Sequence, residues 1–213
     1  ALRRNPELVD AWKVLYKGGA DDVMRTSVEA LNKMKAYLNE GFTVFKKGDG
    51  VYIKQADGTE IGRLDMNDPY NRGELKVKAT HSGRYFDPHK AGGAIQKLDW
   101  KNAVIDKTGI EKVKQHLGRL DPDPWNEGMI KRLEDIEMGK IKATDFDKRF
   151  YTHETREFER YTNLGYKTQK SEEIPDWVWD NAHAATLEDY IVKERIEFNG
   201  EVVKSLYHPS VQK

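Results

Sequence analysis

The chain has 213 residues, enough for one compact domain or for a domain with a small N-terminal attachment. Its 36 Lys and Arg residues balance its 36 Asp and Glu residues, so the formal net charge of zero gives no global electrostatic reason to bind nucleic acid or a membrane. Cysteine is absent, which excludes disulfide bonds, thiolate nucleophiles and zinc sites built from cysteine.

Residues 1–41 are predicted to form a helical hairpin. The signals Asn5-Pro6 and Gly18-Gly19 enclose one helix, and apolar residues at helical spacing predict a second helix over about 27–41. The chain begins without methionine or a leader, so we expect it to be a piece of a longer polypeptide in which this segment is a linker. No apolar run approaches the roughly 18 residues of a membrane span, so none is expected.

Segment 42–80 changes to the two-residue period of β-strands. Short runs rich in β-forming residues are separated by glycine-containing turns, and they cover 42–45, 51–53, 60–64 and 75–79. The dipeptide Asp57-Gly58 is a strong signal for a tight hairpin. We therefore predict a small antiparallel β-sheet in this segment.

The loop over 80–93 combines two histidines, an arginine and a pair of glycines. His81, Arg84 and His89 are the residue types that metal-independent RNA cleavage uses: a base, an acid and a cation for the phosphorane charge. We treat His81 as a candidate catalytic residue, and Arg84 and His89 as candidate substrate-binding residues. The alternative is a polar surface loop whose histidines have no such role.

Basic residues are concentrated in the middle of the chain. Lys and Arg outnumber Asp and Glu over 72–119, which makes this part the expected phosphate-facing surface. Apolar spacing predicts a helix over 108–120 and another over 125–138. His116 lies at the margin of the first apolar face and Arg119 nearly opposite it, and both are candidate substrate-binding residues.

The helix expected over 145–164 has an unusual core-facing stripe. Thr144, with Asp147 three residues later, forms a capping-box signal at its start. At about 100° per residue, the aromatic residues Phe150 and Tyr161 fall on one stripe. These aromatic residues define the side of the helix that should face the core.

His153, Glu157 and Arg160 fall on that same stripe. A solvated face would place its charges opposite the aromatic residues, so a buried row of ionisable groups needs partners or a chemical role. The helix expected over 177–190 repeats the anomaly, because His183 lies close to its apolar line. We therefore expect His153 and His183 to meet across a helix pair with Glu157 or Arg160 between them, and treat all four as candidate catalytic residues.

Two other interpretations stay open. A histidine on an apolar stripe is often a core residue, and a His/Glu/Arg row can be a structural ion network. The stretch from His153 to Glu157 begins like the zinc-binding helix of metalloproteases but has glutamate where the second histidine should be, so that motif fails. As a looser set, His153, Glu157 and His183 can hold a divalent metal, and no other cofactor is expected.

Taken together, the periodicities predict an α+β fold: an N-terminal helical hairpin, a small antiparallel β-sheet and a helical C-terminal half. A small terminal hairpin is expected around Asn199-Gly200. The expected organisation is a linker over 1–41 and a main domain over 42–213, which is β-rich over 42–80 and helical over 108–192.

Several stretches resemble parts of large bacterial polymorphic toxins of the RHS/YD-repeat or contact-dependent inhibition type. Residues 5–15, which read NPELVDAWKVL, resemble a segment that recurs upstream of the variable tips of these toxins. The stretches that resemble a C-terminal tip module span about half of the chain and lie over 109–116, 126–133, 145–154 and 179–190. On this resemblance, residues 1–41 would be a pre-toxin segment and the rest a toxin domain.

That resemblance implies a biological role but does not specify a single activity. Such a tip is secreted with its parent polypeptide and delivered into the cytoplasm of a competing cell, and a cognate immunity protein neutralises it in the producer. Toxin tips include RNases, DNases, deaminases, ADP-ribosyltransferases and peptidases, and the missing cysteines argue against zinc deaminases. We expect a nuclease that cleaves RNA in preference to DNA. The alternatives are a divalent-metal hydrolase built on His153, Glu157 and His183, and a non-enzymatic module for processing or translocation of the toxin.

Overall fold

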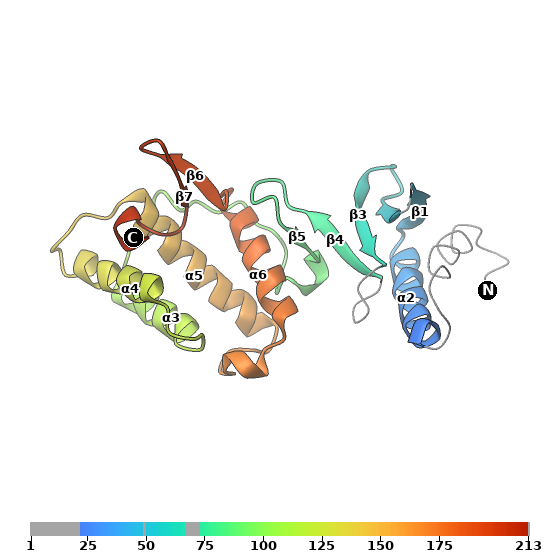
Figure 1. Ribbon diagram of the computed structural model, residues 1–213, viewed down its shortest axis with the longest axis horizontal. Helices are drawn as coiled ribbons and strands as arrows, with labels where there is room; N and C mark the ends of the chain where they lie inside the picture. Colours follow the sequence, from blue (N-terminus) through green and yellow to red (C-terminus); the bar gives the residue numbers. More distant parts are fainter. Residues whose placement is uncertain (1–21, 49, 67–72, 213) are drawn as a thin grey trace. The chain divides into compact units, whose positions relative to one another are not determined.

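The structure is a computed structural model that describes residues 22–48, 50–66 and 73–212. Helices and antiparallel strands occupy separate stretches of the chain (Figure 1), so the predicted α+β class is confirmed. The chain forms two compact units, Ala1–Lys78 and Ala79–Lys213. The division falls after the β-rich segment, so these strands belong with the N-terminal part.

The first unit packs helix α2 (Asp22–Asn39) against an antiparallel meander. Its strands follow one another as hydrogen-bonded neighbours and are β1 (Thr43–Lys47), β2 (Gly50–Lys54), β3 (Glu60–Asp65) and β4 (Glu74–Lys78). Helix and strands share one apolar core that includes Ala30, Met34, Val44, Val51, Ile53, Leu64 and Leu75. The expected strands are thus confirmed, and α2 begins earlier than expected. The first helix of the predicted N-terminal hairpin lies outside the described residues.

Helix α5 (Asp145–Asn163) is the centre of the second unit. Figure 1 shows α3 (Lys107–Leu117) and α4 (Pro124–Glu137) on one side of it and α6 (Asp176–Asp189) on another. The shared core includes Ile110, Val113, Met129, Leu133, Phe150 and Leu187. Because neighbours cover several sides of α5, polar as well as apolar residues of this helix are buried.

Side-chain caps fix where α3, α4 and α5 begin. The Asp106 carboxylate accepts the backbone N–H of Gly109 at the start of α3. At the start of α5, Thr144 and Asp147 form the predicted capping box. Asp147 also pairs with Arg132 of α4, with 2.8 Å between Nε and Oδ1. These contacts fix where α5 starts along its axis, relative to α4.

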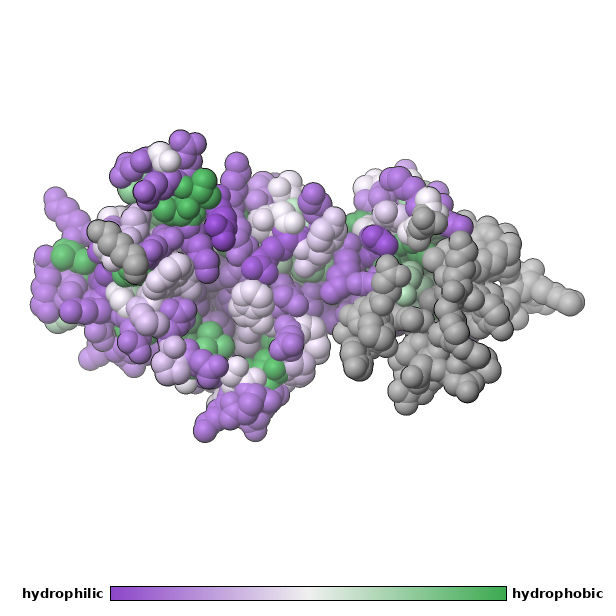
Figure 2. All heavy atoms as spheres, in the orientation of Figure 1, coloured by the Kyte–Doolittle hydropathy of each residue, from purple (hydrophilic) through white to green (hydrophobic). Residues whose placement is uncertain are grey.

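The other elements of the second unit are short. They are β5 (Tyr85–Phe86), β6 (Arg195–Phe198), β7 (Glu201–Lys204) and the 3-10 helices η2 (Pro88–Lys90), η3 (Ser171–Glu173) and η4 (Pro209–Val211). Asn199 and Gly200 both have positive φ and turn the β6–β7 hairpin, as predicted. Hydrophilic residues cover most of the visible face of this unit, while apolar ones gather over that hairpin (Figure 2). Among the described helices, none is both long and apolar enough to cross a membrane.

Candidate functional site

Helices α5 and α6 bring three ligand-type atoms to one point. Nε2 of His153 lies 2.7 Å from Oε2 of Glu157 and 3.0 Å from Nδ1 of His183. That Nδ1 lies 3.2 Å from the same carboxylate oxygen, so the three atoms form a closed triangle. His153 and Glu157 share a face because they are one helical turn apart, and α6 packs across it. The predicted meeting of the two histidines, with Glu157 between them, is confirmed.

Hydrogen bonds alone leave this triangle incomplete. Each imidazole nitrogen carries at most one proton, and an ionised carboxylate carries none. Two protons can therefore serve at most two of the three contacts. If both nitrogens donate to Glu157, the 3.0 Å contact between His153 and His183 brings two N–H groups together. A single cation within the triangle would serve all three atoms.

Within the described part of the chain, two buried groups of side chains can hold a metal ion, and they share Glu157. The first is His153, Glu157 and His183, and the second is His116, Glu154 and Glu157. Histidine nitrogen and carboxylate oxygen suit zinc and related divalent metals. The first group is tighter, because its ligand atoms lie within 3.2 Å of one another.

His116 is oriented differently from the other two histidines. Its Nε2 lies 3.7 Å from Glu154 and 3.8 Å from Glu157. Arg119 donates a close hydrogen bond to its Nδ1, so the neutral ring carries its proton on Nε2 and directs an N–H at the two carboxylates. His116 is therefore a poorer metal ligand than His153 or His183.

The positions of His116 and Arg119 differ from those predicted by helical periodicity. His116 is buried, although periodicity placed it at the margin of the apolar face. Helix α3 ends at Leu117, so Arg119 lies beyond the last turn and is free of the helical period. Its guanidinium turns back over the ring of Tyr161, 4.7 Å away. Arg119 therefore orients His116 instead of pointing away from it.

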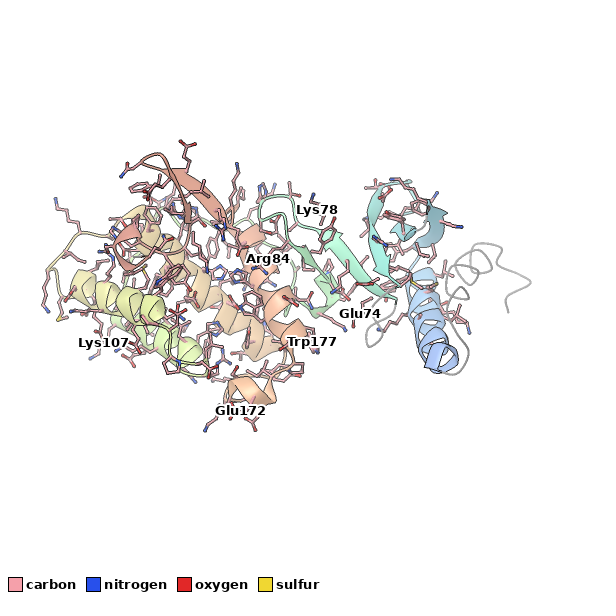
Figure 3. The ribbon with its side chains drawn as sticks, in the orientation of Figure 1. Glu74, Lys78, Arg84, Lys107, Glu172 and Trp177 are labelled. Atoms are coloured by element: carbon pink, nitrogen blue, oxygen red, sulfur yellow. The ribbon has the colours of Figure 1, made fainter. Side chains whose placement is uncertain are left out.

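A second set of contacts surrounds His183. The indole of Trp179 stacks on its imidazole, with ring centroids 5.0 Å apart and planes at 20°. Nε2 of His183 faces Glu194, at 3.8 Å from Oε1. Arg84, labelled in Figure 3, binds the same carboxylate through Nε and Nη2, and its guanidinium lies 4.7 Å from the Trp179 ring. Arg84, named as a candidate substrate-binding residue, is thus part of the site.

The environment pushes the pKa values of these groups in opposite directions. Burial lowers the pKa of His153 to about 4, and Glu157 opposes this only in part. Burial would lower the pKa of His183 too, but the hydrogen bond to Glu157 and the nearby Glu194 carboxylate together raise it to about 9. Burial would raise the pKa of Glu157, yet the three surrounding histidines hold it well below its ordinary value. Burial and the nearby Glu157 raise the pKa of Glu154 well above its ordinary value.

A pocket opens beside the triangle. Glu157 and His183 line it, whereas His153 is not among the described residues that do. The cationic side chains of Arg84 and Lys204 line it as well. Its other lining residues are His116, Leu117, Leu120, Asn126, Glu154, Trp179, Leu187, Glu194, Leu206 and Tyr207. A substrate in this pocket would reach Glu157 and His183 but not His153.

Arg160 belongs to a different network. Its Nη1 donates to the carbonyls of Ala91 (2.6 Å) and Gly93 (2.8 Å), and its Nη2 donates to Asp189 (2.7 Å). The buried Nε–H has no partner among the described residues. The alternative that Arg160 lies between the two histidines is therefore wrong. Arg160 lies about one turn further along α5 than Glu157, and Asp189 binds its guanidinium there.

The loop over 80–93 contributes Arg84 to the pocket, but neither His81 nor His89 is among the described residues that line it. Backbone N–H groups of Thr80, His81 and Ser82 donate to the Glu188 carboxylate near the end of α6. His89 lies on η2 with an exposed side chain. The loop is thus attached to α6 through its backbone.

Glu154 and Glu194 are site residues that the sequence did not identify. Glu154 directly follows His153 in the stretch that resembles a zinc-binding helix, and that dipeptide was its only signal. Glu194 lies between α6 and β6, where no periodic pattern indicates an inward direction. Only the folded chain brings it to His183.

Comparison of the chain with protein-family models, with curated proteins and with solved structures found no match in any of the three.

Proposed function

We propose that the unit Ala79–Lys213 is a nuclease that uses a divalent cation held by His153, Glu157 and His183. The closed triangle of their ligand atoms is the observation that carries this proposal. Two atoms bound about 2.1 Å from a tetrahedral ion lie roughly 3.4 Å apart. The observed separations of 2.7 to 3.2 Å need only small outward movements to admit such an ion.

The pocket supports phosphodiester chemistry at this position. Three protein ligands leave a coordination position open, as in catalytic zinc sites. A bound divalent cation would polarise a phosphoryl oxygen and lower the pKa of water. The side chains of Arg84 and Lys204 line the pocket and supply positive charge for a phosphate group.

The proposed biological role follows the resemblance to polymorphic toxin tips. The domain would be carried by a longer secreted polypeptide, act in the cytoplasm of a competing bacterium and be neutralised in the producer by an immunity protein. RNA is the first substrate to test, and DNA the second. The basic balance over 72–119 favours a polyanionic substrate.

Induction of the chain in bacteria that lack an immunity protein tests this function. We expect growth arrest and degradation of total RNA or DNA on a gel. Dialysis of the purified protein against EDTA should abolish cleavage, and added Mn²⁺, Mg²⁺ or Zn²⁺ should restore it. His153→Gln should be inactive although His153 does not line the pocket, whereas the control His81→Ala should stay active.

Two results would change the proposal. Normal growth with intact nucleic acid would reject the nuclease function. Cleavage that survives EDTA but requires His183 would favour a second candidate, metal-independent cleavage of RNA. The pKa of His183, about 9, supports that candidate because a protonated histidine lining the pocket can act as the general acid.

A further inference from the structure

We infer that Glu194 is a positioning residue for His183, that Arg84 holds Glu194 in place, and that this pair sets the affinity of the metal site. The inference rests on the proposed function, because it concerns the surroundings of a proposed metal ligand. Ligating histidines commonly present their other ring N–H to a carboxylate, which fixes the ring and the nitrogen that binds.

Glu194 faces the nitrogen of His183 that the triangle does not use. Oε1 of Glu194 lies 3.8 Å from Nε2, while Nδ1 faces His153 and Glu157. At that distance the carboxylate orients the ring through its charge and not through a hydrogen bond. A negative charge beside Nε2 favours a proton there, which leaves the Nδ1 lone pair for the ion.

Arg84 and Trp179 restrict the movement of Glu194 and His183. Arg84 holds the carboxylate by a two-point contact, with Nε 2.5 Å from Oε2 and Nη2 2.9 Å from Oε1. Trp179 stacks on the imidazole and restrains its plane. The carboxylate therefore selects the protonated nitrogen, and the indole fixes the orientation of the ring.

The Glu194 carboxylate lies between two cationic or ionisable partners. Within the described part of the chain, its carboxylate pairs only with Arg84 and His183. The backbone here is held separately, because the Glu194 carbonyl accepts the N–H of Ser205. Replacing the carboxylate by an amide should thus leave the fold intact.

Zinc binding to the full chain tests the inference. We expect Glu194→Gln to weaken Zn²⁺ affinity roughly 10- to 100-fold in competition titrations. The matched control Glu197→Gln removes an exposed carboxylate of β6 and should bind like the wild type. Arg84→Met should weaken binding in the same direction, because Glu194 then loses its two-point contact.

Nitrogen NMR of the zinc-loaded protein supplies a readout that a merely structural role would not move. In the wild type, His183 should show a protonated Nε2 and a metal-bound Nδ1. In Glu194→Gln, the Nε2 proton should exchange faster with solvent.

The outcomes separate this inference from the proposed function. Wild-type protein that binds neither Zn²⁺ nor Co²⁺ rejects the metal site, and this inference with it. Tight Zn²⁺ binding that Glu194→Gln leaves unchanged overturns the inference alone. The inference alone is also overturned if Glu194→Gln tightens the binding of inorganic phosphate without changing Zn²⁺ affinity. Glu194 would then be a carboxylate that repels phosphate from the pocket.

Discussion

Glu157 is the carboxylate that all three histidines of the site share. Its Oε2 contacts His153 and His183, and its Oε1 faces His116. The counter-ion of the buried Arg160 is Asp189, so Glu157 is not needed to neutralise that arginine. Its position therefore indicates a role in the site more than in the stability of the fold.

Glu157→Gln should give a folded protein whose metal affinity and cleavage activity are both lower by orders of magnitude. The amide keeps the size of the side chain but removes the charge that a cation requires. Thermal melting, zinc titration and cleavage assays on one preparation check this outcome. A stable and fully active variant would contradict the placement of the site on α5.

Asp189→Asn should instead destabilise the fold. Asp189 pairs with both Arg156 (2.8 Å) and Arg160 (2.7 Å), and its own side chain is fully buried. Leaving a buried cation without its partner costs roughly 3 kcal/mol or more, which should appear as a clearly lower Tm. The control Glu159→Gln removes a half-exposed partner of Arg156 and should change Tm little. Equal melting of both variants would argue against a structural role for this pair.

Metal-free protein should lose stability as the pH rises from about 6.5 to 9, and His183 should account for part of that loss. Its pKa of about 9 in the folded state results from Glu157 and Glu194, which outweigh burial, while His153 on the adjacent helix is neutral. A raised pKa stabilises the fold fully below the unfolded value and no longer does so above the folded value.

Urea unfolding in EDTA across this pH range measures the effect. The expected contribution of His183 is on the order of 3 kcal/mol, since one pKa unit corresponds to about 1.4 kcal/mol. Comparison with His183→Gln cancels the titration of groups that do not interact with His183, whereas Glu154 does interact with it and contributes to the difference. Parallel pH profiles for the two proteins would show that His183 is not protonated more readily in the folded state.

At the scale of the elements, the Tyr151 side chain of α5 lies directly against Gly109 of α3. A Cβ added there would lie 1.8 Å from the Tyr151 hydroxyl. Gly109→Ala should cost roughly 1–3 kcal/mol through overpacking, although alanine is the better helix former. Lys112→Ala, on an exposed position of the same helix, is the control and should melt like the wild type. A Gly109→Ala protein of normal Tm would mean that the Tyr151 side chain can move away from this position without cost.

At the scale of the molecule, every residue of the candidate site lies in the unit Ala79–Lys213. A protein that contains only this unit should therefore bind zinc with the affinity of the full chain and stop bacterial growth equally well. Zinc titration and a growth assay on both proteins compare them. Loss of zinc binding in a folded short protein would assign part of the site to the first unit.

Much of the fold could be predicted from the sequence because the interactions involved are local. The capping box of Thr144 and Asp147 and the turn at Asn199-Gly200 join residues only a few positions apart. The inward direction of His153 and Glu157 follows from the helical period alone. The strands of the first unit could likewise be predicted, because short runs of β-forming residues alternate with glycine-containing turns in the sequence.

Only the tertiary structure decided which of the inward groups meet. Arg160 lies on the same stripe as Glu157, yet Asp189 and two loop carbonyls hold it away from the histidines. Arg84 reaches the pocket because Glu194, far along the chain, binds its guanidinium. Helical periodicity specifies a direction from each helix axis, but the packing of α3 and α6 on α5 and the path of the loops determine what lies in that direction.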